Sequence, residues 1–171
     1  GVIYATFPLA AKFTKEYCGL KESEEDIMAE WMEAAAHAYG HTIPLKPGVW
    51  SFLKRCADAG YEMYIYTSCE EPLCLAALAH HQILRYFRDI FFVRKLNIEK
   101  RKPEGFLWVA EQMNTVPGDV LFFDDSPVAC QGASTAGMQV VACYDELFAQ
   151  HRPELEQLCD AYLTSFEDAL A

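Results

Sequence analysis

Two adjacent aspartates, Asp124 and Asp125, have the side chains best placed in this chain to do chemistry. They directly follow the apolar run DVLFF, which predicts a buried strand. Neighbouring carboxylates at the end of such a strand repel each other and lose water, which is unfavourable unless a cation compensates. Carboxylate oxygens suit Mg²⁺. The pair therefore indicates a hard-metal site, although one aspartate capping the following helix while the other faces water would also explain it.

Hydroxyl and ammonium groups at two other positions are suited to binding phosphate. Thr67 and Ser68 follow the strand-like run EMYIY and precede a helix whose first N–H groups would add to a phosphate cradle. Lys102 precedes Pro103, which fixes the start of a helix and aims the lysine from its rim. Such a lysine can neutralise a carboxylate nucleophile and a phosphoryl oxygen together. Taken singly, the hydroxyls also fit a simple N-cap, and the charge run EKRK also fits a solvated loop.

Strands and helices alternate along the part of the chain that carries these residues. We expect strands over 62–66, 90–93, 119–123, 139–143 and 162–164, and helices over 49–59, 70–82, 103–113, 127–136 and 145–158. This alternation predicts βαβ units and a parallel sheet covered on both faces. Ligands of such sheets bind beyond the carboxyl ends of the strands, where the hydroxyls and the acidic pair are expected.

Two further helices are expected near the start of the chain, over 8–17 and 23–39. Ser23 and the acids after it form an N-cap signal, and Gly40 is expected to end the second helix. We predict a linker at 1–7, a small helical cap at 8–45 and an α/β core at 46–171. The candidate substrate contacts on the cap are Glu30, Trp31, His37, Tyr39 and His41.

Composition narrows the possible classes of function. The chain has 171 residues, of which 52% are hydrophobic and 13% aromatic, so we expect a folded domain with a real core. A net charge of −11 argues against a basic nucleic-acid surface. No apolar run approaches the roughly 20 residues that cross a bilayer, so no membrane partner is expected. The 7 scattered cysteines form no CxxC pair, which favours a reducing cytoplasm.

The order of these motifs resembles that of the haloacid dehalogenase superfamily. YTS is similar to the second motif of the family, RKPEGF to the third and FFDDSPVACQGASTAGM to the fourth, and the resemblance covers residues 46–145. It implies a Rossmann-like, three-layer α/β/α fold with a mostly parallel sheet and a small α-helical cap. Within the family, the chain is most similar to the beta-phosphoglucomutase-like branch, subfamily IA.

The resemblance also implies roles for individual residues. Asp125 would bind Mg²⁺ directly, with Asp124 acting through water or as a second ligand. Thr67, with Ser68 beside it, would hydrogen-bond the transferring phosphoryl group. Lys102 would steady an aspartate nucleophile and the phosphoaspartate that it forms.

The implied function is Mg²⁺-dependent hydrolysis of a small phosphomonoester. A phosphomutase is the alternative enzyme. The acidic pair argues against a dehalogenase, because displacement of halide by an aspartate needs no Mg²⁺.

The family's first motif has the form Asp-X-Asp-Gly-(Thr/Val)-(Leu/Ile). No Asp-X-Asp occurs before residue 46, and the first aspartate of the chain is Asp26, in an expected helix. In one explanation VIYATF is the motif's strand and Ala5 or Thr6 replaces the nucleophile, which would give an inactive phosphate-binding or interaction module. In the other, GVI is the tail of the motif, and both aspartates and the central first strand precede Gly1. The register of Pro8-Leu9, where the cap should open, favours the second explanation. We therefore expect the nucleophile upstream of Gly1.

Overall fold

The computed structural model describes residues 7–96 and 100–170 of the chain. The chain divides into two compact units. One comprises the residues up to Ile43 together with Pro72–His80, and the other comprises Pro44–Glu71 and the residues from His81 onward. The predicted boundary between cap and core at residue 45 stays a prediction.

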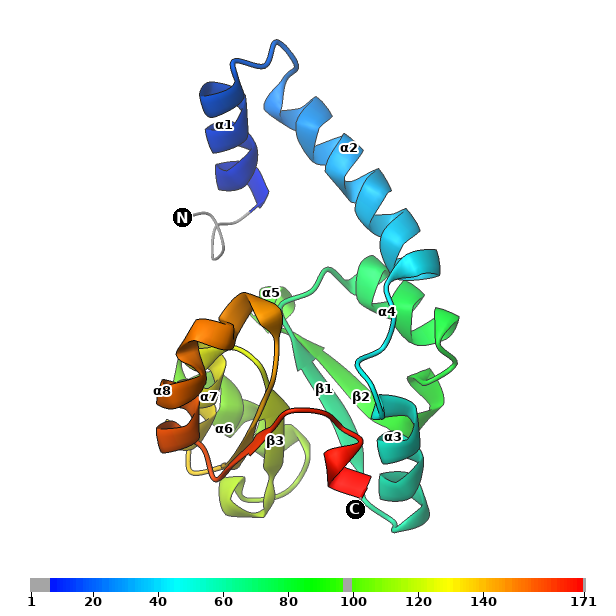
Figure 1. Ribbon diagram of the computed structural model, residues 1–171, viewed down its shortest axis with the longest axis vertical. Coiled ribbons are helices and arrows are strands. Elements are labelled where there is room, and N and C mark those ends of the chain that lie inside the picture. The colour runs from blue at the N-terminus through cyan, green and yellow to red at the C-terminus, as the bar shows by residue number, and fades with distance from the viewer. Residues whose placement is uncertain (1–6, 97–99, 171) are drawn as a thin grey trace. The chain divides into compact units, whose positions relative to one another are not determined.

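The first unit is helical. It contains α1 (Phe7–Cys18) and α2 (Glu24–His37), joined by a turn (Figure 1), the π-helix η1 (Ala38–Thr42) and all of α4 (Glu71–His80) except its first residue. Ser23 begins α2 with a capping box: its Oγ accepts a hydrogen bond from the Asp26 N–H at 3.1 Å, and the Asp26 carboxylate accepts one from the Ser23 N–H at 3.2 Å. The predicted N-cap of this helix is therefore confirmed.

The expectation that Gly40 ends this helix is wrong. The chain continues as a π-helix through Gly40 to Thr42, and the Ile43 N–H donates to the Ala38 carbonyl at 2.9 Å. A glycine that stops a helix takes a left-handed conformation, as Gly19 does after α1 with φ 65°. Gly40 keeps φ outside that region, so the helix widens instead of ending.

The second unit carries the strands. They are β1 (Met63–Thr67), β2 (Phe87–Phe92), β3 (Leu121–Asp124), β4 (Gln139–Cys143) and β5 (Ala161–Leu163). β1 pairs in parallel with β2, and β3, β4 and β5 form a second parallel sheet in that order. Each predicted strand is present within a few residues of its expected place, so the α/β class with parallel strands is confirmed. The strand expected before Gly1 lies outside the described residues.

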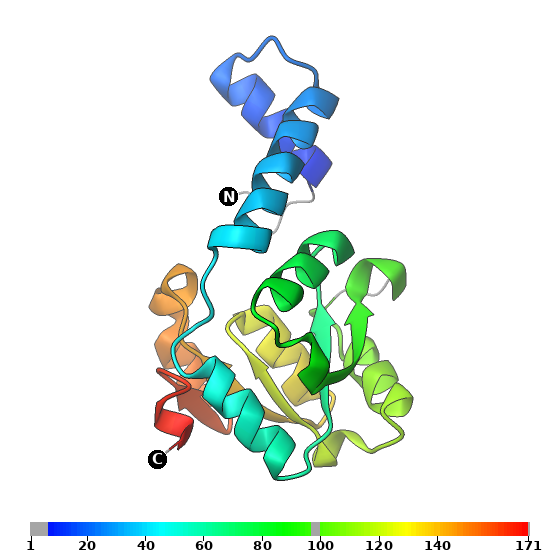
Figure 2. The ribbon, with the colours of Figure 1, turned by 90° about the vertical axis from the view of Figure 1, so that its right-hand side faces the viewer.

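The helices of this unit fall between the strands as the alternation predicts. They are α3 (Val49–Asp58), α5 (Val93–Leu96), α6 (Pro103–Gln112), α7 (Pro127–Thr135) and α8 (Arg152–Leu158), with short 3₁₀ turns η2 (Leu84–Tyr86), η3 (Pro117–Asp119), η4 (Glu146–His151) and η5 (Asp168–Leu170). The single helix expected over 145–158 is instead η4 followed by α8, because Pro153 lacks an N–H and suits only a first turn. The segment before α3 carries no helix or strand (Figure 2).

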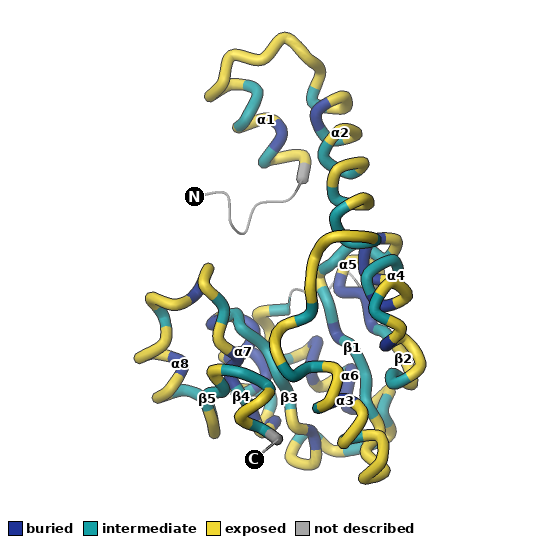
Figure 3. Tube along the Cα trace, turned by 45° about the vertical axis from the view of Figure 1, so that its right-hand side comes forward, coloured by how far each residue is buried: buried dark blue, intermediate teal, exposed yellow. Residues whose placement is uncertain are grey.

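The core of this unit lies between the strands and α6, α7 and α8. Its most buried side chains include Phe106, Cys130, Val140 and Leu155, and buried positions gather on α7 and the neighbouring strands (Figure 3). A Cβ on Gly132 would lie 2.7 Å from Phe106 Cε2, so α7 and α6 approach as closely as glycine allows. This packing fixes the end of β3, where the acidic pair lies. In the described part of the chain, no helix is long and apolar enough to cross a membrane.

Candidate active site

The acidic pair lies where β3 ends and α7 is about to begin. Asp124 is the last residue of β3, and its Oδ1 accepts a hydrogen bond from the Ser126 N–H at 2.9 Å. Its Oδ2 lies 2.5 Å from the Lys100 ammonium. Both side chains are largely withdrawn from water, with 11% of Asp124 and 20% of Lys100 exposed. Asp124 therefore has a helix-start contact and a counterion at once.

Asp125 lies in a different electrostatic setting. Burial raises the pKa of its carboxyl, and the charge of Asp124 raises it further. Asp145 adds to this effect, while the Lys46 ammonium opposes it. In the described residues no ion pair joins Asp125 to a lysine or arginine. Asp125 is thus the carboxylate of this region whose ionised form most needs a cation.

Lys100, two residues before the predicted Lys102, forms an ion pair with Asp124 of the acidic pair. Its ammonium also lies 5.9 Å from the ring centre of Tyr66 and 5.5 Å from that of Phe122, within the range of cation–π attraction. Lys102 is instead the exposed N-cap residue of α6, as expected from Pro103. The role predicted for Lys102 stays a prediction, and Lys100 is a second candidate for it.

The run of three cations gives no sequence signal that separates Lys100 from Lys102. What fixes their places is tertiary packing. A Cβ on Gly132 would meet the Arg101 carbonyl oxygen at 3.0 Å, so α7 presses against the backbone between the two lysines. That contact could not be foreseen without the fold.

The predicted hydroxyls lie at the end of β1. Thr67 is its last residue, and its Oγ1 accepts a hydrogen bond from the Cys69 N–H at 3.0 Å. Ser68 is exposed. Thr67 directly follows Tyr66, whose ring faces the Lys100 ammonium, so Lys100 links the end of β1 to the end of β3. Contact of the Thr67 hydroxyl with the acidic pair stays a prediction.

The acidic pair suits a hard divalent cation. Mg²⁺ typically binds through one or two carboxylates and fills its other positions with water or phosphate oxygens. No group of three or more His, Cys, Asp or Glu side chains within residues 7–96 and 100–170 could hold a metal ion by itself. The donors at hand, two carboxylates with one of them lacking a counterion, fit Mg²⁺ completed by water and a phosphate.

Other predicted residues remain untested by this geometry. Glu30, Trp31 and His37 lie on α2, and Tyr39 and His41 lie on η1. Their contact with substrate stays a prediction. Ala5, Thr6 and the aspartates expected before Gly1 lie outside the described residues.

A family model and curated relatives both match this chain. A family model described as haloacid dehalogenase-like hydrolase matches residues 7–143. The phosphorylated carbohydrates phosphatase of Thermotoga maritima is 26% identical over 120 residues, which cover 70% of this chain and 56% of that protein. The phosphoglycolate phosphatase of Pseudomonas putida is 31% identical over 117 residues, which cover 68% and 43%. The chain thus spans about half the length of the curated relatives it matches.

Solved structures show the same fold. A candidate beta-phosphoglucomutase from Thermotoga maritima superposes with a TM-score of 0.84 at 22% identity, covering 99% of this chain and 78% of that one. The L-2-haloacid dehalogenase of Xanthobacter autotrophicus gives a TM-score of 0.72 at 18% identity, covering 95% and 71%. At these identities the likeness concerns the fold alone. It confirms the predicted Rossmann-like architecture.

Proposed function

Because the chain belongs to the family of haloacid dehalogenase-like hydrolases, we propose that the whole protein is a Mg²⁺-dependent phosphatase acting on a small phosphorylated metabolite. The predicted family and hydrolase class are confirmed by the family match and by the phosphatases among the relatives. The observation that carries the proposal is the cluster of Lys100, Asp124 and Asp125 at the end of β3.

Phosphoryl transfer depends mainly on positioning and on neutralising charge. Asp125 would hold Mg²⁺, with Asp124 beside it, and the bound cation would neutralise phosphoryl oxygens. The Lys100 ammonium, fixed by Asp124 and by two aromatic rings, would offset the charge that gathers on the transferring group. The Thr67 hydroxyl would donate to a phosphoryl oxygen. The nucleophile is an aspartate that forms a phosphoaspartate, and it is the part of the proposal outside the described residues.

A small phosphorylated substrate is supported by the names of the relatives, two of which are phosphatases of phosphorylated carbohydrates and of phosphoglycolate. A phosphomutase would use the same cluster, and product analysis separates the two: a phosphatase releases inorganic phosphate, whereas a mutase returns an isomeric phosphate ester. We also propose a reducing, cytoplasmic location, supported by the 7 cysteines, all of which lie in the described residues and none of which forms a disulfide there.

The test is phosphate release by the complete gene product from a panel of sugar phosphates and phosphoglycolate. We expect activity that needs Mg²⁺, disappears with EDTA, and falls at least about 100-fold in Asp125→Asn, equivalent to about 3 kcal/mol in the barrier. Asp119→Asn is the matched control, since Asp119 is exposed in η3 just before β3 begins. Full activity of Asp125→Asn would contradict the proposal.

A further inference from the structure

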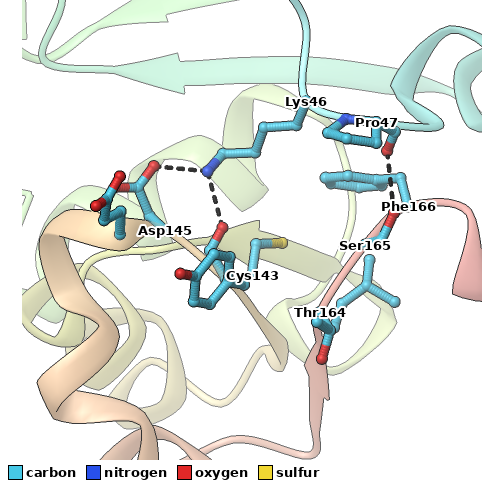
Figure 4. A pocket seen from close by; sticks show the side chains of 10 residues that line it. Lys46, Pro47, Cys143, Asp145, Thr164, Ser165 and Phe166 are labelled. Carbon is cyan, nitrogen blue, oxygen red and sulfur yellow. Dashed lines mark hydrogen bonds and ion pairs between the residues drawn. The ribbon is translucent and has the colours of Figure 1, made fainter.

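A second lysine–carboxylate ion pair, Lys46 with Asp145, lies near the acidic pair. Lys46 lies in the segment before α3, and its ammonium is 2.6 Å from Asp145 Oδ2 and 2.8 Å from the Tyr144 carbonyl oxygen (Figure 4). Asp145 Oδ1 also accepts a hydrogen bond from the Leu147 N–H at 2.9 Å, at the start of η4. The Asp145 carboxylate is therefore held on both of its oxygens.

Asp145 lies at the same edge of the sheet as the acidic pair. β3 and β4 run parallel with Asp124 opposite Ala142, so Asp125 and Asp145 both follow the carboxyl ends of neighbouring strands. The hydrogen bond from Lys46 is the largest cause that lowers the Asp145 pKa. The three carboxylates and the two lysines thus form one charge cluster.

The pairing within this cluster is uneven. Asp124 has Lys100 at 2.5 Å and Asp145 has Lys46 at 2.6 Å, whereas Asp125 has no such partner in the described residues. The Lys46–Asp145 pair also lines a cavity of about 190 Å³ and is partly exposed, so ions can reach it from solvent. A cation at Asp125 would find Asp145 nearby but already occupied.

We propose that Lys46 is a positioning residue that withholds Asp145 from the cation site and leaves Asp125 as its ligand. This inference rests on the proposed function, because it needs a cation at the acidic pair. Mg²⁺ is satisfied by one or two carboxylates and water, whereas Ca²⁺ takes about six to eight oxygen ligands and gains from an added carboxylate. Withholding Asp145 therefore favours the smaller ion.

The test is calorimetric titration of Mg²⁺ and of Ca²⁺ into the complete gene product without substrate. Lys46→Met frees Asp145, so we expect Ca²⁺ to bind at least about tenfold more tightly and Mg²⁺ to gain less. Asp145→Asn leaves the Lys46 ammonium free to approach Asp125, so both ions should bind about tenfold more weakly. The double variant, Lys46→Met with Asp145→Asn, removes both the added carboxylate and the added ammonium, so its affinities for both ions should lie close to those of the parent. Lys46→Arg keeps Asp145 paired and should match the parent.

Lys54→Met is the matched control, because it removes an exposed lysine–aspartate pair of 2.5 Å, with Asp58, in the same unit. Parent-like Ca²⁺ affinity in Lys46→Met overturns the inference, as does a double variant that fails to restore the parent values. If Lys46→Met does not fold, Asp145→Asn decides, since asparagine keeps an oxygen for the Leu147 N–H. No Mg²⁺ binding by the parent, or binding unchanged in Asp125→Asn, overturns the proposed function as well.

Discussion

At the residue scale, Asp124 depends on Lys100 because both side chains are largely removed from water and lie 2.5 Å apart. Removing one partner of a buried ion pair leaves the other charge uncompensated. We expect Lys100→Met to lower the free energy of unfolding by about 3 kcal/mol, measured by urea denaturation. Phosphatase activity of the complete gene product should fall with it, since the same ammonium would face the phosphoryl group.

Lys102→Met is the control for this prediction. Lys102 is exposed at the start of α6, and substitutions at such positions usually change stability by less than about 0.5 kcal/mol. If the two variants lose stability and activity equally, the assignment of Lys100 is wrong and the role expected for Lys102 stands.

The sequence predicts the acidic pair better than it predicts its counterion. Asp124 and Asp125 could be placed because a strand-like run must end where polar residues begin, and this boundary depends on local pattern. The place of Lys100 depends on α7, at Gly132, lying against the backbone of Arg101 before α6 begins, which is a long-range contact. Asp145 and Lys46 carry no motif at all, and only the pairing of β3 with β4 brings Asp145 to the site.

At the element scale, the start of α3 depends on a glycine. Gly48 has φ 81°, and a Cβ there would lie 2.4 Å from the Glu167 backbone nitrogen. The segment after β5 therefore packs directly against this turn. We expect Gly48→Ala to cost about 2 to 4 kcal/mol of unfolding free energy, from the left-handed backbone and from the clash together.

Gly60 separates these two causes. It has φ 83°, but a Cβ added there would have no atom within 4 Å, so Gly60→Ala should cost only about 1 kcal/mol. The unfolding free energies of both variants should be measured by denaturant unfolding under the same conditions. An equal loss in the two variants would show that the segment after β5 does not press on Gly48 in solution.

Element boundaries show the same division between local and long-range causes. The strand at Gln139–Cys143 was predictable to the residue because a turn precedes it and the side chains after Gln139 are apolar. The π-helix after α2 was not, since Gly40 favours a stop locally and only the Ile43 to Ala38 hydrogen bond shows otherwise. The break before α8 did have a local signal in Pro153.

At the scale of the whole molecule, the family and the α/β class follow from the order of motifs along the chain. This order can be recognised even when the predicted boundaries of any one helix or strand are wrong by a few residues. The division into two units is harder to predict, because α4 follows β1 in sequence yet its residues Pro72–His80 group with the N-terminal helices. Contact between elements decides this grouping, and spacing along the chain does not reveal it.

The buried thiols of the core give the molecule a dependence on alkaline pH. Burial, followed by the charge of Asp124, raises the pKa of Cys143 from an ordinary 9.0 to about 12. Burial raises the pKa of Cys130 as well, followed by a smaller effect of Cys159. Above about pH 9 the unfolded chain loses thiol protons that the folded chain keeps, so stability falls as pH rises toward 12.

We therefore expect the melting temperature to fall as the pH rises from about 8.5 to about 11, because the unfolded thiols ionise over this range and the buried ones do not. Circular dichroism in a reducing buffer measures it. Cys143→Ala removes one such proton. The unfolding free energy of this variant should therefore fall less steeply with pH than that of the parent, the two slopes differing by up to about 1.4 kcal/mol per pH unit. Cys18→Ala, which changes an exposed thiol, should leave the slope unchanged. Parallel slopes for the parent and Cys143→Ala would mean that this thiol ionises as easily in the folded protein as in the unfolded chain.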